Sequence, residues 1–286
     1  MSAMDHESAK DYLVFISHSS MDTWVASQIA REVADCGAKT FLDEADIAVG
    51  ADFEADILSH LEQAHELLVL LTPWALERAY VWAEIGAAWG RRIPIVALLH
   101  GLSPREVQSK AGVPNLLKSR NLIGLNEIDS YFDRAKGARG TRAELTEPHP
   151  MGNSVFISYP HTEAEQEWVE GFSKSLQAKG FNVWLDRWQL GVGEDIQAAI
   201  EKGLRESDNI VWVVNKDNVR SPNTLFELGA AAGMGKLGTV IISNEMDPAL
   251  VPGILRSKRF LKRQSPEETA NAFAAEASPK ASEQRG

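Results

Sequence analysis

The amino-acid sequence predicts an α/β protein of two doubly wound domains, each built around a parallel sheet of about five strands. Segments of the first half recur in the second half, and within each copy short apolar runs alternate with helical stretches. Such alternation requires a crossover helix between successive strands, and these connections produce parallel strands with helices on both faces. A length of 286 residues and a hydrophobic content of 44% allow two domains of ordinary size.

The repeat is visible in three pairs of stretches that keep the same order. They are YLVFISHSS (12–20) and NSVFISYPH (153–161), GAKTFLDEADIAVG (37–50) and GFNVWLDRWQLGVG (180–193), and LLVLLTPW (67–74) and IVWVVNKD (210–217). One constant offset relates the pairs Gly37 and Gly180, Asp43 and Asp186, Gly50 and Gly193, Ile57 and Ile200, and Glu84 and Glu227. Chance matches would drift in register, so the constant offset indicates a duplication.

Five apolar runs of the first copy are the predicted strands, because each is continuous and bounded by turn residues. In order they are YLVFIS (12–17), KTFL (39–42), LLVLL (67–71), IPIVALL (93–99) and RNLIGL (120–125). Helical spacing of four or five residues fills the gaps, as in Trp24, Ile29 and Val33 or in Ile196, Ile200 and Leu204. The result is a flavodoxin-like order in each copy, whose ligand site lies beyond the carboxyl ends of the strands.

Composition shifts divide the chain. The stretch between the copies is rich in Gly, Arg, Thr and Pro, which is typical of a surface linker, and the C-terminal AEASPKASEQRG is polar and low in apolar residues. We expect a first domain at 1–137, a linker at 138–153, a second domain at 154–264, and a terminal helix with a disordered tail at 265–286.

Charge and cysteine content exclude several classes of protein. A formal net charge of -11 and the absence of a long Lys/Arg run argue against a non-specific nucleic-acid binder, which needs a concentrated basic face. The single cysteine, Cys36, rules out an internal disulfide framework. No apolar run is long enough for a membrane helix, and the polar N-terminus lacks the apolar centre of a signal peptide. We therefore expect a cytoplasmic protein without membrane contact.

Polar residues follow the predicted strands at the edge where doubly wound sheets bind ligands. Ser17 ends the first strand of the first copy and His18 follows it, and Ser158 and Tyr159 occupy the matching places in the second copy. Each second strand leads into an acidic loop, which carries Asp43 in the first copy and, in the second, Asp186 followed by Trp188. We expect these seven residues to contact a substrate, although strand-end packing and helix capping are the plainer interpretations.

A glutamate stands in the helix that follows the third strand of each copy. Glu84 lies in VWAEIGAAWG and Glu227 in TLFELGAAAG, in both cases just before a run of small residues. Small residues allow such a helix to pack closely against the sheet, which would bring the carboxylate near the strand ends. The alternative is a carboxylate at the rim of a packed helix, paired with Arg91 or Arg92.

Each copy resembles a TIR (Toll/interleukin-1 receptor) domain of the bacterial type. VFISHSSMD is similar to the first-strand motif of that family, LDEADIAVGADFEADI to its BB loop and following helix, and YVWAEIGAA to the helix that carries the catalytic glutamate of NAD-cleaving members. The second copy departs more, since YPHTEAEQ replaces the serine-rich turn and RSPNTLFELGAAAGMGKLG resembles TIR-like nucleotide-binding variants.

The resemblance implies hydrolysis or cyclisation of NAD+ with Glu84 and Glu227 as the catalytic residues. NAD+ would then be a substrate and no cofactor is expected, in keeping with the absence of a dinucleotide-binding fingerprint. GAAAGMGKLG is not a phosphate loop, because Leu237 follows Gly235-Lys236 where Ser or Thr is required. The histidines show no metal-ligand spacing, so no metal is expected.

Two other interpretations stay open. TIR domains also act as scaffolds that associate with one another or with other TIR proteins, and tandem copies raise each other's local concentration. Alternatively, the first copy is the enzyme and the second senses a nucleotide signal. By the family's example, the biological role would be anti-phage immunity or interference with host signalling, and neither role follows from the residues.

Overall fold

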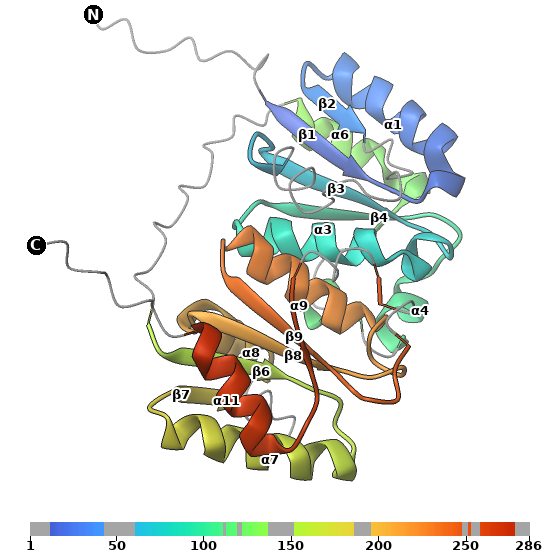
Figure 1. Cartoon of the computed structure of the whole chain (residues 1–286). Helices are drawn as coiled ribbons and strands as arrows, with labels where there is room; N and C mark the ends of the chain where they lie inside the picture. The colour runs from blue at the N-terminus through green and yellow to red at the C-terminus, as the bar shows by residue number, and fades with distance from the viewer. Residues whose placement is uncertain are drawn as a thin grey trace, which may run out of the picture. The chain divides into compact units, whose positions relative to one another are not determined.

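The computed structural model describes eight ranges of the chain: 12–42, 61–110, 113–118, 122–136, 152–185, 196–247, 251–252 and 258–277. The first copy forms a five-stranded parallel sheet with the strand order β2-β1-β3-β4-β5. Figure 1 shows its strands β2, β1, β3 and β4 side by side. Its strands are β1 (Leu13–Ser17), β2 (Lys39–Leu42), β3 (Glu66–Leu71), β4 (Ile95–Leu99) and β5 (Leu122–Gly124). These are the five predicted runs, and the predicted fold class is confirmed for this copy.

Helices and short 3-10 turns connect these strands. They are η2 (Ser20–Asp22), α1 (Thr23–Asp35), η3 (Ala75–Glu77), α3 (Ala79–Gly90), α4 (Pro104–Ser109), α5 (Asn115–Lys118), η4 (Leu125–Glu127) and α6 (Asp129–Ala135). Helices α1 and α6 contact each other over one face of the sheet. Helix α3 follows β3 and contacts β3 and β4.

Alternate side chains of the strands build the core beneath α1 and α6. Its buried residues include Val14, Ile16, Leu68, Leu70, Val96 and Leu98 from the strands, Ile29 and Val33 from α1, and Tyr131 from α6. All six residues of β3 are buried, as expected for a central strand covered on both faces. This burial fixes the register of the strands and hence the positions of their carboxyl ends.

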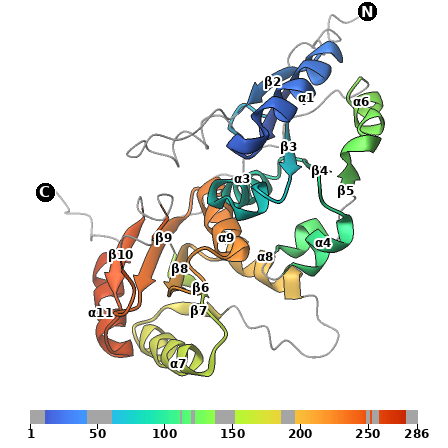
Figure 2. The same cartoon turned by 90° about the vertical axis from the view of Figure 1, so that its right-hand side faces the viewer.

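The second copy repeats this plan, with the strand order β10-β9-β8-β6-β7 and all pairs parallel. Its strands are β6 (Ser154–Ser158), β7 (Asn182–Leu185), β8 (Asn209–Val214), β9 (Leu237–Ile242) and β10 (Arg259–Lys262), and its helices are α7 (Glu163–Ala178), α8 (Ile196–Glu206), α9 (Pro222–Gly233) and α11 (Pro266–Ala277). Figure 2 shows α11 beside β10 and α7 beside β7, and the two helices contact each other over a core that includes Phe172 and Phe273. The predicted fold class is confirmed here too.

The same backbone device ends the first helix of both copies. Helix α1 is followed by Gly37 at φ 97°, and α7 is followed by Gly180 at φ 86°. The amide of Gly37 donates to the carbonyl of Ala34 at 2.9 Å. Only glycine adopts this left-handed conformation without steric cost, so both glycines stop a helix and turn the chain into the second strand.

The amino-terminal edge of each sheet carries a matching polar contact. In the first copy, the amide of Leu13 donates to His65 Nδ1 at 3.2 Å. In the second copy, the amide of Ser154 donates to Asp208 Oδ2 at 3.1 Å. In both cases the residue just before the central strand satisfies the first backbone N–H of the first strand. The duplication therefore preserved a position while changing its side chain.

Glu66 opens β3 at this edge and is buried. Its carboxylate accepts hydrogen bonds from Tyr131 Oη at 2.7 Å and from Tyr12 Oη at 3.4 Å. Burial nonetheless raises the pKa of Glu66, since the cost of desolvating the charge exceeds the opposing effects of the two phenols and of Arg134. The cluster lies at the edge opposite to the predicted ligand site.

The stretch 229–238 contains the end of a helix and the start of a strand. Helix α9 stops at Gly233, Gly235 adopts φ 67°, and β9 starts at Leu237. Lys236 Nζ donates to the backbone carbonyls of Arg205 and Ser207. Burial lowers the pKa of Lys236 to about 8, although Asp208 acts in the opposite direction. Lys236 therefore has a structural role, since its ammonium group binds backbone carbonyls.

Candidate functional site

The carboxyl edge of the first sheet is formed by the turn after β1 and the segment after β3. Ser17 ends β1 and is fully buried, and its hydroxyl has no hydrogen-bond partner among the residues that the structure describes. His18 is also buried, and its Nε2 lies 3.3 Å from Thr23 Oγ1. Both residues therefore lie at the predicted edge of the sheet, and both are buried.

A buried hydrogen bond joins the two segments of this edge. Thr72, the residue after β3, donates from Oγ1 to Asp22 Oδ2 at 2.6 Å and accepts from the amide of Ala75 at 3.0 Å. Asp22 and Thr72 are both buried. We call this pair the Asp22–Thr72 clamp. The clamp was not predicted from the sequence, because neither residue belongs to a motif whose spacing indicates its partner.

The start of α3 lies against the turn after β1. Tyr80 donates from Oη to the backbone carbonyl of His18 at 3.1 Å. Arg78 Nε lies 3.5 Å from Ser19 Oγ, which is too long for a strong hydrogen bond. These contacts bring Arg78 and Tyr80 to the same edge as Ser17 and His18, and neither was predicted as a site residue.

Glu84 lies one helical turn after Tyr80 in α3 and is fully buried. Every residue of α3 from Val81 to Gly90 is buried, so this helix presents no polar face in that stretch. The ion pair that the structure describes for Arg91 is with Glu62, at 3.0 Å. Glu84 is thus an interior residue of a core helix.

The second copy places its predicted residues alike. Ser158 ends β6, and Tyr159 follows with its ring centroid 4.8 Å from that of His161; Ser158 and Tyr159 are both buried. Glu227 lies in α9 and is fully buried. The duplicated glutamates therefore share both their position in the fold and their burial.

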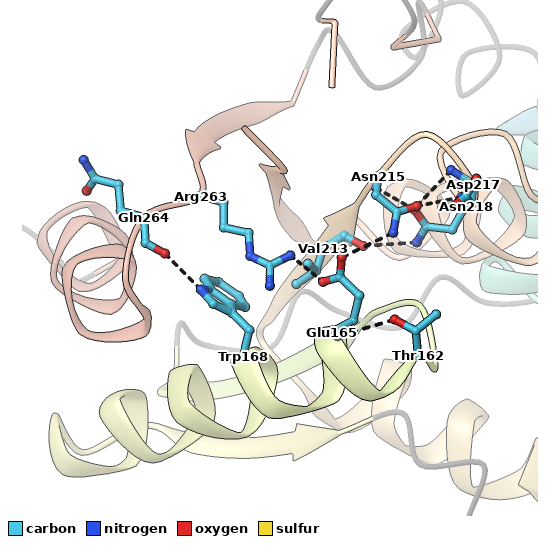
Figure 3. A network of polar contacts seen from close by, with 9 residues as sticks. All are labelled: Thr162, Glu165, Trp168, Val213, Asn215, Asp217, Asn218, Arg263 and Gln264. Carbon is cyan, nitrogen blue, oxygen red and sulfur yellow. Dashed lines mark hydrogen bonds and ion pairs between the residues drawn. The ribbon is translucent and has the colours of Figure 1, made fainter. Parts of the chain in front are cut away.

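A larger polar network occupies the carboxyl edge of the second sheet (Figure 3). Glu165, in the first turn of α7, accepts hydrogen bonds from Asn215 Nδ2 at 3.3 Å and from the guanidinium of Arg263. Arg263 also lies over the ring of Trp168, 4.4 Å from its centroid, and Trp168 Nε1 donates to the carbonyl of Gln264 at 2.9 Å. The network joins α7 to the ends of β8 and β10.

The carboxyl edges of the two sheets differ in how many hydrogen bonds and ion pairs their polar side chains make. Glu165 and Asn215 stand at the offset that relates Glu84 to Glu227, so they correspond to Asp22 and Thr72. The second copy keeps this clamp and adds the cation of Arg263, stacked on an aromatic ring. In the first copy, the described side-chain hydrogen bonds of the clamp are the one from Thr72 to Asp22 and the one from the amide of Ala75 to Thr72.

Three predicted site residues, Asp43, Asp186 and Trp188, lie outside the described residues, as does most of the predicted linker. Within the described ranges, no cluster of three or more His, Cys, Asp or Glu side chains is arranged to hold a metal ion. In the same ranges, no helix has the length and apolarity required to span a membrane.

Comparison with known proteins now decides the family. The model of the TIR domain matches residues 14–136 and 155–275, which is both copies and most of the chain. The chain belongs to the TIR-domain family. The second match ends inside α11 and so includes most of the helix that packs on α7.

Curated relatives of this tandem TIR protein are similar over shorter stretches. A 2′ cyclic ADP-D-ribose synthase of Acinetobacter baumannii, AbTIR, is 34% identical over 74 residues, which are 26% of this chain and 27% of the relative. An NAD(+) hydrolase of Paracoccus denitrificans, PdTIR, is 36% identical over 67 residues, or 23% of this chain and 21% of the relative. BtTIR of Bacteroides thetaiotaomicron, also a 2′ cyclic ADP-D-ribose synthase, is 21% identical over 128 residues, or 44% and 45%. The match spans less than half the length of each.

Proposed function

We propose that this TIR protein cleaves the bond between nicotinamide and ribose in NAD+, and that it releases nicotinamide with ADP-ribose or a cyclic form of it. The observation that carries the proposal is the position of Glu84, in the helix after the third strand of a TIR domain. The names of the relatives, NAD(+) hydrolase and 2′ cyclic ADP-D-ribose synthase, support the reaction class.

A single carboxylate suffices for this chemistry. Loss of nicotinamide leaves positive charge on the ribose, in a transition state like that of glycoside hydrolysis. Nicotinamide is cationic in NAD+ and departs neutral, so no general acid is required. An ionised glutamate against the ribose hydroxyls orients the sugar and stabilises the developing charge, most effectively where water is excluded.

Full burial of Glu84 has a consequence for this mechanism. The carboxylate must contact the ribose, so the helix and its surroundings have to rearrange before NAD+ can react. We propose that assembly of the protein, through TIR–TIR contacts or a partner, supplies the free energy for that rearrangement. Activity is then expected to rise more steeply than in proportion to protein concentration.

The difference between the two edges supports catalysis in the first copy. In the second copy, Glu165, Asn215 and Arg263 are bound to one another at the carboxyl edge, which favours a structural or regulatory role. A regulatory second copy would sense a nucleotide or another signal and bias the first. Glu227 remains the candidate catalytic residue of that copy if both are active.

The test is NAD+ consumption by the purified chain at several protein concentrations, with Glu84→Gln, Glu227→Gln and the double variant. Glutamine keeps the shape and removes the charge, so packing is preserved while electrostatic stabilisation is lost. We expect Glu84→Gln to lower kcat by at least 100-fold, since loss of one preorganised electrostatic group costs on the order of 10²–10³. Glu227→Gln is expected to alter regulation more than the chemical step.

Glu127→Gln serves as the matched control, because this glutamate is exposed and lies in η4. It should keep wild-type activity. Nicotinamide release that persists in the double variant would exclude the glutamates as catalytic groups. No nicotinamide from the wild type, even under crowding that forces association, would favour the alternative of a scaffold.

The scaffold alternative has its own observation. Met21, Trp24 and Trp74 are the exposed large hydrophobic side chains among the described residues, and all three lie in the segments that form the carboxyl edge of the first sheet. Exposed aromatic residues are enriched in protein interfaces. Trp24→Ser with Trp74→Ser should abolish self-association, measured by analytical ultracentrifugation, if the edge acts as a docking surface.

A further inference from the structure

Arg78 is the feature of the first copy that the proposed chemistry leaves unexplained. It is the residue before α3, its side chain is partly buried, and its Nε lies 3.5 Å from Ser19 Oγ. No carboxylate of the described ranges pairs with its guanidinium. Burying even part of a guanidinium is unfavourable unless an anion compensates for the lost water.

The corresponding position of the second copy shows what a purely structural residue does there. Ser221 stands at the offset that relates Glu84 to Glu227. Its Oγ accepts a hydrogen bond from the amide of Thr224 at 3.1 Å, as an N-cap of α9 should. Arg78 makes no such side-chain cap to α3. The first copy therefore gives up a stabilising cap and places a cation at this point.

Other groups at this edge are also suited to an anion. The buried hydroxyl of Ser17 has no partner in the described part of the chain, and the hydroxyl of Ser19 lies 3.5 Å from Arg78 Nε. Arg78, the N-cap residue of α3, makes no side-chain cap to the helix, and the helix dipole favours negative charge at this end.

We propose that Arg78 binds the diphosphate of the substrate at the carboxyl edge of the first copy. The inference rests on the proposed function and names a residue that positions NAD+ for it. Guanidinium groups bind phosphate oxygens through two parallel hydrogen bonds, which fixes orientation as well as affinity. Arg78 precedes Glu84 by six residues, or about 9 Å along the helix axis. The diphosphate is joined to the reacting ribose, so one helix would hold both ends of the same unit.

The test separates binding from turnover by using ADP-ribose, which carries the diphosphate and both riboses but has no bond to nicotinamide. Calorimetry gives its Kd for the wild type, Arg78→Ser and Arg78→Lys. Loss of a charge-assisted contact should weaken binding about 10–100-fold in Arg78→Ser, with a smaller loss in Arg78→Lys, which keeps the charge without the planar fork. Adenosine, which lacks phosphate, should bind all three proteins equally.

Two matched variants control for charge and for stability. Arg31→Ser removes the same charge from an exposed site two turns along α1, and its Kd should stay within about twofold of the wild type, as expected for a screened surface charge. Ser221→Ala removes the cap of α9 and should lower the melting temperature without changing the Kd. Melting curves of the Arg78 variants confirm that they fold, and Arg78→Lys carries the test if Arg78→Ser does not.

The outcomes distinguish this inference from the proposed function. An unchanged Kd for ADP-ribose and an unchanged KM for NAD+ in Arg78→Ser would overturn the role of Arg78, even if NAD+ is consumed. Weakened ADP-ribose binding in a protein that never releases nicotinamide would support Arg78 and refute the enzyme. In an active enzyme, we expect KM to rise with little change in kcat, whereas a merely structural role would lower stability instead.

Discussion

The Asp22–Thr72 clamp is predicted to hold the candidate site of the first copy together. Thr72 donates to Asp22 at 2.6 Å and accepts from the amide of Ala75, and both clamp residues are buried. Asp22→Ala removes the acceptor and leaves the hydroxyl of Thr72 without its partner in a place closed to water. Asp22→Asn keeps an oxygen of nearly the same shape at that position.

The magnitude follows from the type of contact. A hydrogen bond to a charged group contributes about 1.5–3 kcal/mol, and a buried donor that loses its acceptor costs a similar amount. Asp22→Ala should therefore lower the free energy of unfolding by about 2–3 kcal/mol. Asp22→Asn retains a neutral hydrogen bond and should lose about 1 kcal/mol. Thr72→Val combined with Asp22→Ala should show a coupling of about 0.5–3 kcal/mol.

Urea unfolding of the full chain, fitted with a transition for each domain, gives these free energies. Glu127→Ala is the control, since an exposed glutamate should change stability by less than about 0.5 kcal/mol. A loss in Asp22→Ala no larger than in this control would refute the clamp. Additive effects of the two clamp substitutions would show that the two side chains do not act on each other.

Two further predictions concern parts of the fold away from the site. Burial raises the pKa of Glu66, so the folded state holds its proton more tightly than the unfolded chain, and its contribution is present at low pH and lost as pH rises through the raised pKa. Glu66→Gln stays neutral at every pH and keeps an acceptor for Tyr131. The free energy of unfolding of this variant minus that of the wild type, measured by urea titration, should therefore increase from about pH 4 to about pH 8. A difference that does not depend on pH would contradict this. Phe273 of α11 is fully buried, so Phe273→Ala should cost about 3–5 kcal/mol in the unfolding of the second domain, measured calorimetrically, and a loss below about 1 kcal/mol would mean that α11 is not part of that core.

The sheets could be predicted because their signals are local. A strand covered on both faces needs an unbroken apolar run, and β3 and β8 show it in every residue. Once the strands are placed, parallel pairing puts their carboxyl ends at one edge, which is why Ser17 and Ser158 stand where the sequence predicted. Local pattern and global topology agree here, as they do in most natural folds.

The polar partners could not be predicted in the same way. Asp22 and Thr72 are fifty residues apart, and their contact depends on how η2 and η3 turn after their strands. The repeat did hold a usable signal, because the corresponding residues Glu165 and Asn215 are polar too. The sequence alone could not decide the full burial of Glu84, since a glutamate in an apolar helix is compatible with a rim position until the packing of the helix is known.

Because the two copies arose by duplication, comparing the carboxyl edges of their sheets separates the contacts that the fold requires from those that it does not. Two copies that start alike keep the contacts that the fold requires, and the clamp after the first strand survives in both with changed side chains. Contacts that differ between the copies are not required by the fold in both. The second copy uses Arg263 to bind Glu165 and a serine to cap α9, so its cation and its helix start are both satisfied internally. The first copy places Arg78 where the cap would be. A cation held at a ligand edge at the expense of helix stability is better explained by a bound anion than by folding, so we expect the chemistry to reside in the first copy.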